Sequence, residues 1–392
     1  KLGFCLYKYF PYGGLQRDFI RMARECLHRG HTVRIYVLKW AGPIPTDLDI
    51  TVIPVKALFN HSKYRKFSEA LALALAKDPV DCVVGFNKMP GLDIYYAADS
   101  CYEEKARSQR GWLYRHMSRY KHFSAYESAV FSSQSSTEIM SISDVQKPYF
   151  IQHYSTQEKR FHTLPPGIAL DRIAPSNAAA IRRDKREKLG LKNTDKLILM
   201  VGSGFVKKGL RRAILSIRSL PTEWRKRVKF IVIGEDNAKP FNRLIKRLGI
   251  EENVKILGGS GDIPAFLLAG DFLLHPALDE NAGMVLLEAM VAGLPVLATE
   301  VCGYGHYVVE ADVGALVSSP FNQIELNKKL LLLMQSDRRH EWQRNGRRFA
   351  ETANIYSLAN EAARIIESVG VRGQPSANMG SLAFALFKYF PF

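Results

Sequence analysis

Apolar residues in this chain fall into short continuous runs, separated by stretches in which they recur at helical spacing. The short runs predict buried strands in the first half at 2–7, 32–38, 50–55, 81–86, 94–98 and 138–143, and in the second half at 196–202, 228–234, 254–257, 272–275 and 296–299. The stretches between them predict amphipathic helices, for example at about 15–29, 62–76 and 239–248. Strands that alternate with helices are typical of α/β proteins with doubly wound parallel sheets, and we expect that fold class here.

This alternation is interrupted at 164–167 (LPPG), where two prolines and a glycine break any regular element. The break predicts a junction between two Rossmann-like domains, 1–165 and 166–352. A chain of 392 residues is long enough to give both domains a full core. Helices are also predicted after about residue 323, and we expect those at about 353–370 to pack back on the first domain.

The end of the chain nearly repeats its beginning. Residues 382–392 (LAFALFKYFPF) are similar to residues 2–12 (LGFCLYKYFPY), and Met379-Gly380 precedes the repeat like a second start. We interpret the segment 373–392 as a fusion remnant without a function of its own. A strand that adds to the edge of a sheet is the alternative interpretation.

Composition limits the class of protein. The chain is 47% hydrophobic and 24% charged, which is typical of a globular protein. Its five cysteines are scattered without a CxxC pair, which argues against a disulfide framework or a zinc site and for a reducing cytoplasm. No apolar run reaches the roughly 18 residues needed to span a bilayer, and no signal peptide precedes the first strand. We therefore expect a cytoplasmic protein.

The formal net charge of +17 predicts an anionic partner. Basic residues are spread over both halves and no nucleic-acid module signature is present, so we expect no nucleic-acid partner. Between Lys105 and Phe131, however, basic residues interleave with aromatic ones such as Trp112. A helical segment of this composition is typical of one that lies on an anionic bilayer. A solvated helix whose aromatic residues pack on the core is the alternative.

The stretch 275–300 (HPALDENAGMVLLEAMVAGLPVLATE) predicts a loop, a helix and a strand. Glu280 precedes the helix and Glu288 lies about two turns inside it, so the two would contact different parts of an elongated ligand. The start of the helix leaves backbone N–H groups free, which suits a phosphate or a sugar oxygen. The residues expected to bind ligand there are Asn281, Ala282, Gly283, Met284 and Val285. An ordinary helix with one capping and one solvated glutamate is the alternative.

Two further loops precede helices and carry candidate binding residues. Lys207 and Lys208 follow the predicted strand 196–202, where two ammonium groups beside free N–H groups would clamp a diphosphate. Gly13 and Gly14 follow the first strand and would let the backbone approach a phosphate or a sugar closely. A plain turn explains the two glycines equally well, and solvated side chains are the alternative for the two lysines.

Two aspartates in the first half are candidate acids or bases. Asp99 falls at the carboxyl end of the predicted strand 94–98, where ligands gather in doubly wound sheets, although a helix cap is the alternative. Asp18 is expected in the first turn of the helix at about 15–29. An acid at that position also has an ordinary role beside the positive end of the helix dipole.

These stretches occur together in one order. They are YKYFPYGGLQRDF (7–19), GFNKMPGLDIYYAAD (85–99), LPPGIALDR (164–172), FVKKG (205–209) and the motif that begins HPALDENAG (275–299). Over about residues 1–370 the chain thereby resembles the lipopolysaccharide core glucosyltransferases, which are retaining enzymes of the GT-B class, family 4. The resemblance implies two Rossmann-like domains that face each other across a cleft. It also implies transfer of a hexose, with glucose expected, from a UDP-sugar to a heptose of the lipid A-linked inner core, without a required metal or other cofactor.

The resemblance also implies roles for individual residues. On the donor side, Arg172, Lys207 and Lys208 would hold the diphosphate and offset charge as UDP departs. Glu280 would bind hydroxyl groups of the hexose, and Glu288 would bind the ribose. This family works at the cytoplasmic face of the inner membrane, which fits the basic segment Lys105–Phe131, and we expect a peripheral protein that acts as a monomer.

On the acceptor side, the resemblance implies that Gly14, Asp18 and Asp99 face the sugar and the acceptor. Retention by double displacement needs a carboxylate nucleophile roughly 5 Å from its partner, and no such residue is obvious in this class. We therefore expect front-side attack on an ion-pair-like state, with Asp99 as a positioning or proton-accepting group. Another UDP-sugar, such as UDP-galactose or a UDP-N-acetylhexosamine, or another lipid-linked acceptor remains an alternative. A non-catalytic scaffold that binds membranes is an alternative of a different class.

Overall fold

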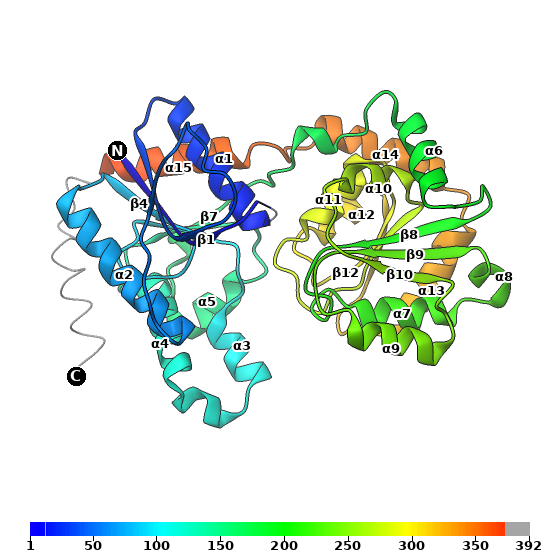
Figure 1. Cartoon of the computed structure of the whole chain (residues 1–392), viewed down its shortest axis with the longest axis horizontal. Helices are drawn as coiled ribbons and strands as arrows, with labels where there is room; N and C mark the ends of the chain where they lie inside the picture. Colours follow the sequence, from blue (N-terminus) through cyan, green and yellow to red (C-terminus); the bar gives the residue numbers. More distant parts are fainter. Residues whose placement is uncertain (12, 373–392) are drawn as a thin grey trace. The chain divides into compact units, whose positions relative to one another are not determined.

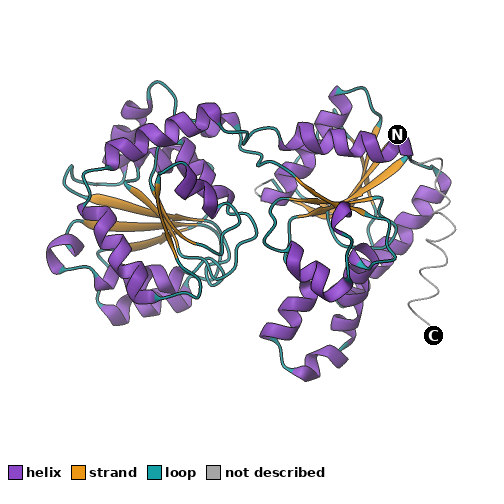
Figure 2. Ribbon diagram, turned by 180° about the vertical axis from the view of Figure 1, so that it is seen from behind, coloured by secondary structure: helices purple, strands orange, loops and turns teal. Residues whose placement is uncertain are grey.

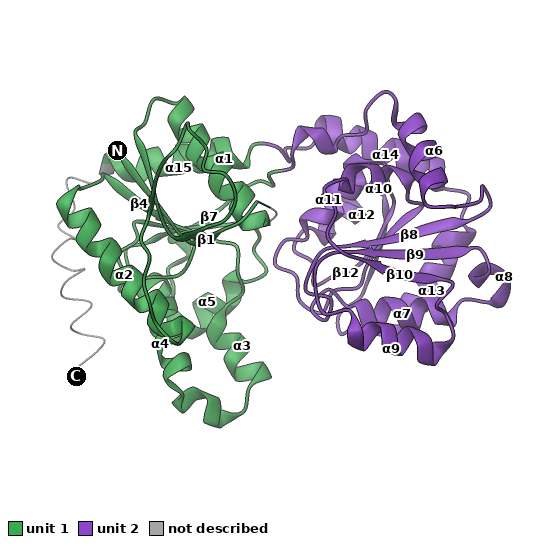
Figure 3. Cartoon of the chain, viewed as in Figure 1, with its two compact units in different colours: residues 1–167, 357–392 green, residues 168–356 purple. Residues whose placement is uncertain are grey.

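The computed structural model describes residues 1–11 and 13–372, so the segment predicted as a fusion remnant, 373–392, lies outside the described residues. The chain divides into two compact units (Figure 3). The first unit consists of Lys1–Gly167 and the segment from Ser357 onward, and the second consists of Ile168–Tyr356. Within the described part of the chain, no helix is both long enough and apolar enough to cross a membrane.

The first unit is built on a sheet of seven parallel strands in the order β3-β2-β1-β4-β5-β6-β7 (Figure 1). The strands are β1 (Leu2–Tyr9), β2 (Val33–Trp40), β3 (Asp49–Val52), β4 (Cys82–Gly85), β5 (Ile94–Ala97), β6 (Glu138–Ser141) and β7 (Phe161–Thr163). Strand β1 lies at the centre and is buried from Leu2 to Tyr7, as its continuous apolar run predicts.

Helices cover both faces of this sheet (Figure 2). They are α1 (Gly14–His28), α2 (Asn60–Lys77), α3 (Tyr102–Gln109), α4 (Ser118–Phe131), α5 (Lys147–Tyr154) and α15 (Leu358–Arg372), with a short 3-10 helix, η1 (Trp112–His116), between α3 and α4. Helix α15 comes from the end of the described chain and packs against α1. Glu367 joins it to the end of α1, because its carboxylate lies 2.9 Å from both Arg29 Nη1 and His31 Nε2.

The second unit repeats this plan with six parallel strands in the order β10-β9-β8-β11-β12-β13. The strands are β8 (Lys196–Val201), β9 (Val228–Ile233), β10 (Val254–Leu257), β11 (Phe272–His275), β12 (Val296–Thr299) and β13 (Gly314–Val317). The helices are α6 (Ala178–Lys188), α7 (Leu210–Ser219), α8 (Thr222–Arg225), α9 (Lys239–Leu248), α10 (Ile263–Ala269), α11 (Met284–Val291), α12 (Gly305–Glu310), α13 (Gln323–Gln335) and α14 (Arg339–Thr352). The predicted α/β class with two doubly wound parallel sheets is confirmed.

Each unit has its own apolar core between its sheet and its helices. In the second unit Phe230 and Leu274 lie in the centre of this core and are fully buried. In the first unit Phe131 of α4 stacks on Phe150 of α5, with ring centroids 3.6 Å apart. All five cysteines are buried free thiols.

The sequence patterns miss the strands β7 and β13 and the short helices α8 and α12. Strand β7 has three residues, Phe161–Thr163, and none of them is fully buried, so it lacks a continuous apolar run. Strand β13 begins at Gly314, a residue that weakens strand patterns, and no residue before Val317 is fully buried. Both strands lie at the edge of their sheets, where packing on the core demands less apolar surface than in the centre.

Candidate active site

Two loops in the second unit follow neighbouring strands and are held together. Strands β8 and β11 pair in parallel, so the loops after them leave the same edge of the sheet. The Leu278 N–H donates to the Lys207 carbonyl over 2.8 Å. A Cβ at Gly209 would lie 1.9 Å from the Pro276 carbonyl oxygen, and Gly209 also has a φ of 78°. Only glycine fits this position, because of both the close approach and the left-handed backbone.

This junction brings Lys208 and Glu280 together. The Lys208 ammonium makes an ion pair with Glu280 Oε2, and His275 Nε2 lies 3.4 Å from the same oxygen. His275 is the last residue of β11 and its side chain is fully buried. The structure therefore unites the two residues expected to clamp a diphosphate and to bind a hexose, and adds a buried imidazole behind them.

The charges around Glu280 determine its protonation state. Burial on its own would raise the pKa of the Glu280 carboxyl, but the hydrogen bond with His275 and the charge of Lys208 outweigh that effect and lower the pKa to about 2. Burial lowers the pKa of His275, which keeps this imidazole neutral. At neutral pH the site therefore holds an ionised carboxylate beside an ammonium group.

The loop after Glu280 leads directly into helix α11. Gly283 caps the helix in the left-handed conformation with a φ of 89°, so the helix starts at Met284. The Ala282 carbonyl accepts the Tyr304 N–H over 2.7 Å, and Asn281 is buried. This fixed turn gives the first N–H groups of α11 a defined direction, and the N-cap residue, Gly283, has no side chain that could accept them.

Arg172 and Glu288 form a second charged pair in this unit. Arg172 Nε lies 3.9 Å from Glu288 Oε1 and 3.5 Å from Asp171 Oδ1. Nevertheless, Arg172 Nε and Nη1 are buried and have no hydrogen-bond partner among the described residues. A buried guanidinium with unsatisfied N–H groups is costly unless a ligand accepts them, and a phosphate is the acceptor that arginine binds best.

Lys207 has a more exposed position than Lys208. Its ammonium lies 3.4 Å from Asp279 Oδ2. Both lysines directly precede α7, as the sequence predicts, but each one pairs with an acid of the β11 loop. The cations of this region are thus balanced by carboxylates, and an incoming anion has to compete with Asp279 and Glu280 for them.

In the first unit, the two glycines before α1 differ in their surroundings. A Cβ at Gly13 would lie 1.8 Å from Oε1 of Gln16, whereas a Cβ at Gly14 meets no atom within 4 Å. A side chain at Gly13 would thus displace the end of the Gln16 side chain. Space beside Gly14 is open, which leaves its backbone accessible to a ligand.

Asp18 does not lie in the part of helix α1 where the sequence predicts it. Helix α1 begins at Gly14, and its first turn holds no acidic residue, so the predicted position of Asp18 in that turn is wrong. The reason is that the helix starts earlier than its apolar pattern suggests, directly after Gly13. Asp18 is instead buried and accepts a hydrogen bond of 2.7 Å from the Tyr96 hydroxyl. Burial raises the pKa of Asp18 to about 6, although the Tyr96 hydroxyl acts in the opposite direction.

Asp99 lies just beyond the end of β5, as predicted, and its side chain is 65% exposed. One oxygen accepts from the Tyr95 hydroxyl, and the other lies 3.3 Å from Lys88 Nζ. Lys88 also lies 2.6 Å from Glu127 Oε1, and Glu127 is completely buried. Burial on its own would lower the pKa of Lys88, but Asp99 and Glu127 raise it well above its ordinary value. Lys88 therefore stays charged, and its ammonium group lies between the carboxylates of Asp99 and the buried Glu127.

Glu127 connects this pair to the start of α3. Its carboxylate accepts the backbone N–H groups of Tyr102 and Glu103 over 2.7 and 2.8 Å, and the Tyr154 hydroxyl over 2.8 Å. The sequence patterns did not indicate Lys88, Glu127, Tyr96 or His275 as site residues. Two signals were available: Lys88 lies inside the quoted motif 85–99, and His275 is the first residue of the motif 275–299.

The predicted membrane segment, Lys105–Phe131, forms the end of α3, η1 and α4. Its turn exposes three large apolar side chains: Trp112 is 66%, Leu113 64% and Met117 54% exposed. None of the residues of η1 is buried. In α4, by contrast, Tyr126 and Phe131 pack in the core, so the aromatic residues of the segment divide into an exposed group and a buried group.

The comparisons with known proteins agree with this geometry. A family model described as "Glycosyl transferases group 1" matches residues 181–349. The structure of Anabaena HepE in complex with UDP-glucose has a TM-score of 0.72 at 18% identity and covers 94% of this chain and 99% of that one, a likeness in fold. Two doubly wound sheets together with this family match define a GT-B glycosyltransferase.

Similarity extends along nearly the whole chain for one relative. The lipopolysaccharide glucosyltransferase WaaG of Escherichia coli K12 is 45% identical over 366 residues, which are 93% of this chain and 98% of that protein. A crystal structure of WaaG superposes with a TM-score of 0.88 and covers 93% of this chain and 99% of that one. The chain therefore belongs to the WaaG family of lipopolysaccharide glucosyltransferases. A D-inositol 3-phosphate glycosyltransferase of Corynebacterium glutamicum is less similar, at 27% identity over 55% of this chain and 52% of that protein.

Proposed function

We propose that this glycosyltransferase moves glucose from UDP-glucose to an inner-core heptose of lipopolysaccharide, with retention of configuration and without a required metal ion. The observation that carries the proposal is the buried Arg172 guanidinium with unsatisfied N–H groups, in the same unit as the Lys208–Glu280 pair. This set suits the diphosphate of a nucleotide sugar. Similarity to WaaG supports the choice of donor hexose and acceptor.

On the donor side, Arg172, Lys207 and Lys208 hold the diphosphate and offset the negative charge that develops on UDP as the sugar leaves. Glu280, which is kept ionised, accepts hydrogen bonds from hexose hydroxyl groups. Glu288 on α11 binds the ribose. The turn Asn281–Gly283 and the first residues of α11, Met284 and Val285, direct backbone N–H groups at the ligand.

On the acceptor side, Asp99 orients the heptose hydroxyl that attacks, and Asp18 lines the same side beside Gly14. Because no residue is assigned as a covalent nucleophile, the hydroxyl attacks from the face on which UDP departs. In this proposal the bond from the anomeric carbon to the diphosphate oxygen breaks while the bond to the heptose oxygen forms, and Asp99 accepts the proton that the heptose hydroxyl loses.

The test is UDP release measured with a panel of UDP-hexoses, with and without heptosylated lipid A core as acceptor. Acceptor-dependent release with UDP-glucose is expected. Release with UDP-galactose or a UDP-N-acetylhexosamine instead would overturn the donor, and release only with another lipid-linked glycan would overturn the acceptor. Replacing Arg172 by Gln is expected to weaken UDP binding about tenfold or more, as calorimetry would measure.

We also propose that the protein acts as a monomer at the cytoplasmic face of the inner membrane, through Lys105–Phe131. Support comes from Trp112, Leu113 and Met117, which expose apolar side chains among basic residues. Replacing Trp112 by Ser is expected to reduce sedimentation with phosphatidylglycerol-containing vesicles about tenfold. The matched control is Ile324→Ser, which removes a large apolar side chain of the second unit that is likewise exposed. Equal loss in both variants would contradict this part of the proposal.

A further inference from the structure

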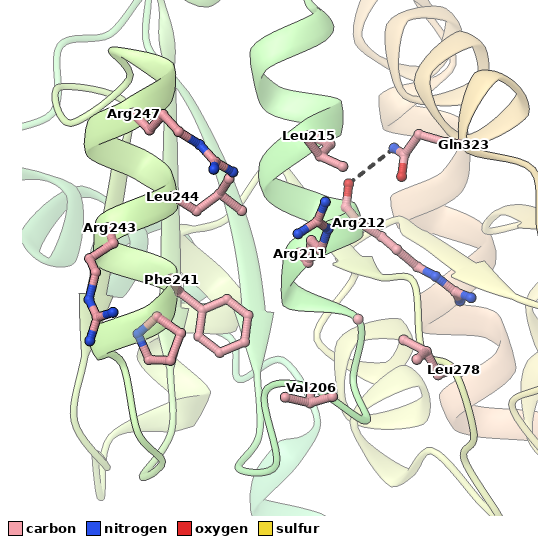
Figure 4. A pocket seen from close by; sticks show the side chains of 12 residues that line it. Val206, Arg211, Arg212, Leu215, Phe241, Arg243, Leu244, Arg247, Leu278 and Gln323 are labelled. Atoms are coloured by element: carbon pink, nitrogen blue, oxygen red, sulfur yellow. Dashed lines mark hydrogen bonds between the residues drawn. The ribbon is translucent and has the colours of Figure 1, made fainter. Parts of the chain in front are cut away.

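A groove of about 690 Å³ lies in the second unit between helices α7 and α9 (Figure 4). We call it the arginine groove, because Arg211 and Arg212 of α7 and Arg243 and Arg247 of α9 line it. None of the residues assigned above to the donor or the acceptor lines it. Its volume lies within the range of about 300–1,000 Å³ that is typical of small-molecule sites.

The inner surface of the groove is apolar. Phe241 and Leu244 of α9 form part of it, and each is only 8% exposed because both also belong to the core of the unit. Toward solvent the groove is bordered by Val206 and Leu278, which expose 68% and 46% of their surface. A ligand in this groove would therefore cover apolar surface along its length.

The charge of the groove has one sign. Helices α7 and α9 carry seven basic residues and no acid, namely Arg211, Arg212, Arg218, Lys239, Arg243, Lys246 and Arg247. No acidic side chain is among the residues that line the groove. The resulting positive potential favours an anion over a neutral or cationic ligand.

Three of the four lining arginines are available to a ligand. Arg212 is already used: its Nη1 donates to the Ala277 carbonyl over 2.8 Å, and its guanidinium lies 3.6 Å above the Phe321 ring. Arg211, Arg243 and Arg247 make no hydrogen bond or ion pair through their side chains within residues 1–11 and 13–372. In Figure 4 Arg247 extends from α9 toward α7, and Arg211 is drawn in front of α7.

We propose that the arginine groove binds an anionic phospholipid, with the phosphate held by Arg211, Arg243 and Arg247. The glycerol and the first acyl carbons would lie on Phe241, Leu244 and Leu215. Guanidinium groups match phosphate geometry, and the apolar inner surface requires a ligand with an apolar part next to its charge. The choice of a lipid among phosphate-bearing amphiphiles rests on the function proposed above, in which the acceptor is anchored in a bilayer.

Such a lipid would bind close to the donor loops. Val206 and Gly209 belong to the loop that carries Lys208, and Leu278 belongs to the loop that carries Glu280. Arg212 ties the groove to the latter loop through the carbonyls of Pro276 and Ala277. The occupied groove would therefore give the second unit its own contact with membrane lipid, independent of Lys105–Phe131 in the first unit.

The test uses dihexanoyl phosphatidylglycerol, which is soluble as a monomer, in calorimetric titrations of the full chain. Saturable binding is expected, and glycerol phosphate should bind at least about tenfold more weakly because it lacks the methylene groups that the apolar surface covers. The double variant Arg243→Gln/Arg247→Gln should bind the lipid about tenfold more weakly, since two charge-assisted contacts are lost. The matched control is Arg344→Gln/Arg348→Gln on α14, which has the same spacing and charge change and should bind like the unchanged protein.

Several results would overturn the proposal: no saturable binding, equal losses in the groove and control variants, or equal binding of dihexanoyl phosphatidylcholine. Tighter binding of an acidic peptide than of the lipid would overturn it in favour of a protein partner. Thermal melting of both variants shows whether they are folded. The titration contains neither donor nor acceptor, so its failure and a failure of the proposed transferase function are distinguished by the separate UDP-release measurement.

Discussion

Glu280 in the second unit and Asp18 in the first are both largely buried carboxyl groups, yet their pKa values move in opposite directions. The pKa of Glu280 falls to about 2, whereas that of Asp18 rises to about 6. Burial favours the neutral form at both sites. The difference comes from the partners: the His275 hydrogen bond and the Lys208 charge outweigh burial at Glu280, whereas at Asp18 the Tyr96 hydroxyl and the charges of Arg21 and Arg17 do not.

The same difference determines how each group contributes to stability. Glu280 has a lower pKa in the folded than in the unfolded chain, so its contribution is present above pH 4.5 and is lost as the pH falls toward 2. Asp18 has a higher pKa in the folded chain, so folding is favoured most below pH 3.8 and that contribution is lost as the pH rises through about 6. At neutral pH the donor-side acid is therefore stabilising, and Asp18 is destabilising.

The largest effect is expected from Lys208→Met, which removes the ammonium group that makes an ion pair with Glu280. The pKa of Glu280 should rise, and transfer should fall by about 10²–10³-fold because charge on the departing UDP is no longer offset. The measurement is kcat/KM for UDP release across pH. The control is Lys207→Met, which removes a more exposed ammonium that lies 3.4 Å from Asp279 and should cost less than about tenfold. Equal losses in both variants would contradict a special role for Lys208.

A smaller effect is expected from Lys88→Met, which leaves the buried Glu127 carboxylate without its cation. Loss of one partner of a buried ion pair typically costs about 3–5 kcal/mol, which denaturant titration would measure. Adding Glu127→Gln removes the buried charge and should restore part of this stability, because the amide nitrogen cannot accept the hydrogen bonds that the second carboxylate oxygen accepts. Transfer should stay about tenfold or more below normal in the double variant, because Asp99 has still lost its contact with Lys88. Full recovery of both stability and transfer would exclude a positioning role for Lys88.

Much of the fold could be predicted from the sequence because both sheets are parallel and covered on both faces. Central strands such as β1 and β8 then have continuous apolar runs that the sequence displays directly. The edge strands β7 and β13 have no such runs, since packing on the core does not require them. Where a helix begins after a glycine, as α1 does after Gly13, its first residue depends on the conformation of the preceding loop. Contacts with residues far away in the sequence determine that conformation.

The candidate site could be predicted only in part, and for a related reason. Glu280 and Lys208 belong to short motifs with recognisable neighbours, so their involvement follows from local sequence. Their pairing does not, because it depends on the contact between the loops after β8 and β11. Likewise, Glu127 lies 28 residues after Asp99 in a helix whose sequence gives no sign that this glutamate reaches Lys88. A side chain that acts through another residue, as Glu127 acts through Lys88, belongs to no local sequence motif.

The smallest effect is expected from Asp18→Asn, which keeps an oxygen that can accept from the Tyr96 hydroxyl but removes the titration. The shift of the Asp18 pKa from 3.8 to about 6 corresponds to roughly 3 kcal/mol at most. The variant should therefore melt several degrees higher than the unchanged protein at pH 8, and the difference should vanish below pH 4. Differential scanning calorimetry at both pH values measures this dependence.

The control for Asp18→Asn is Asp47→Asn, because Asp47 is half exposed whereas Asp18 is buried. Arg24 lies 2.8 Å from its carboxylate, and that hydrogen bond lowers the pKa of Asp47. Its replacement should therefore give no gain in melting temperature as the pH rises. If both variants gain equally, the effect belongs to the loss of negative charge in general rather than to burial. If the melting temperature of Asp18→Asn rises as much at pH 4 as at pH 8, the gain arises from packing. In that case the pKa of Asp18 is not raised by burial, and the contrast with Glu280 is wrong.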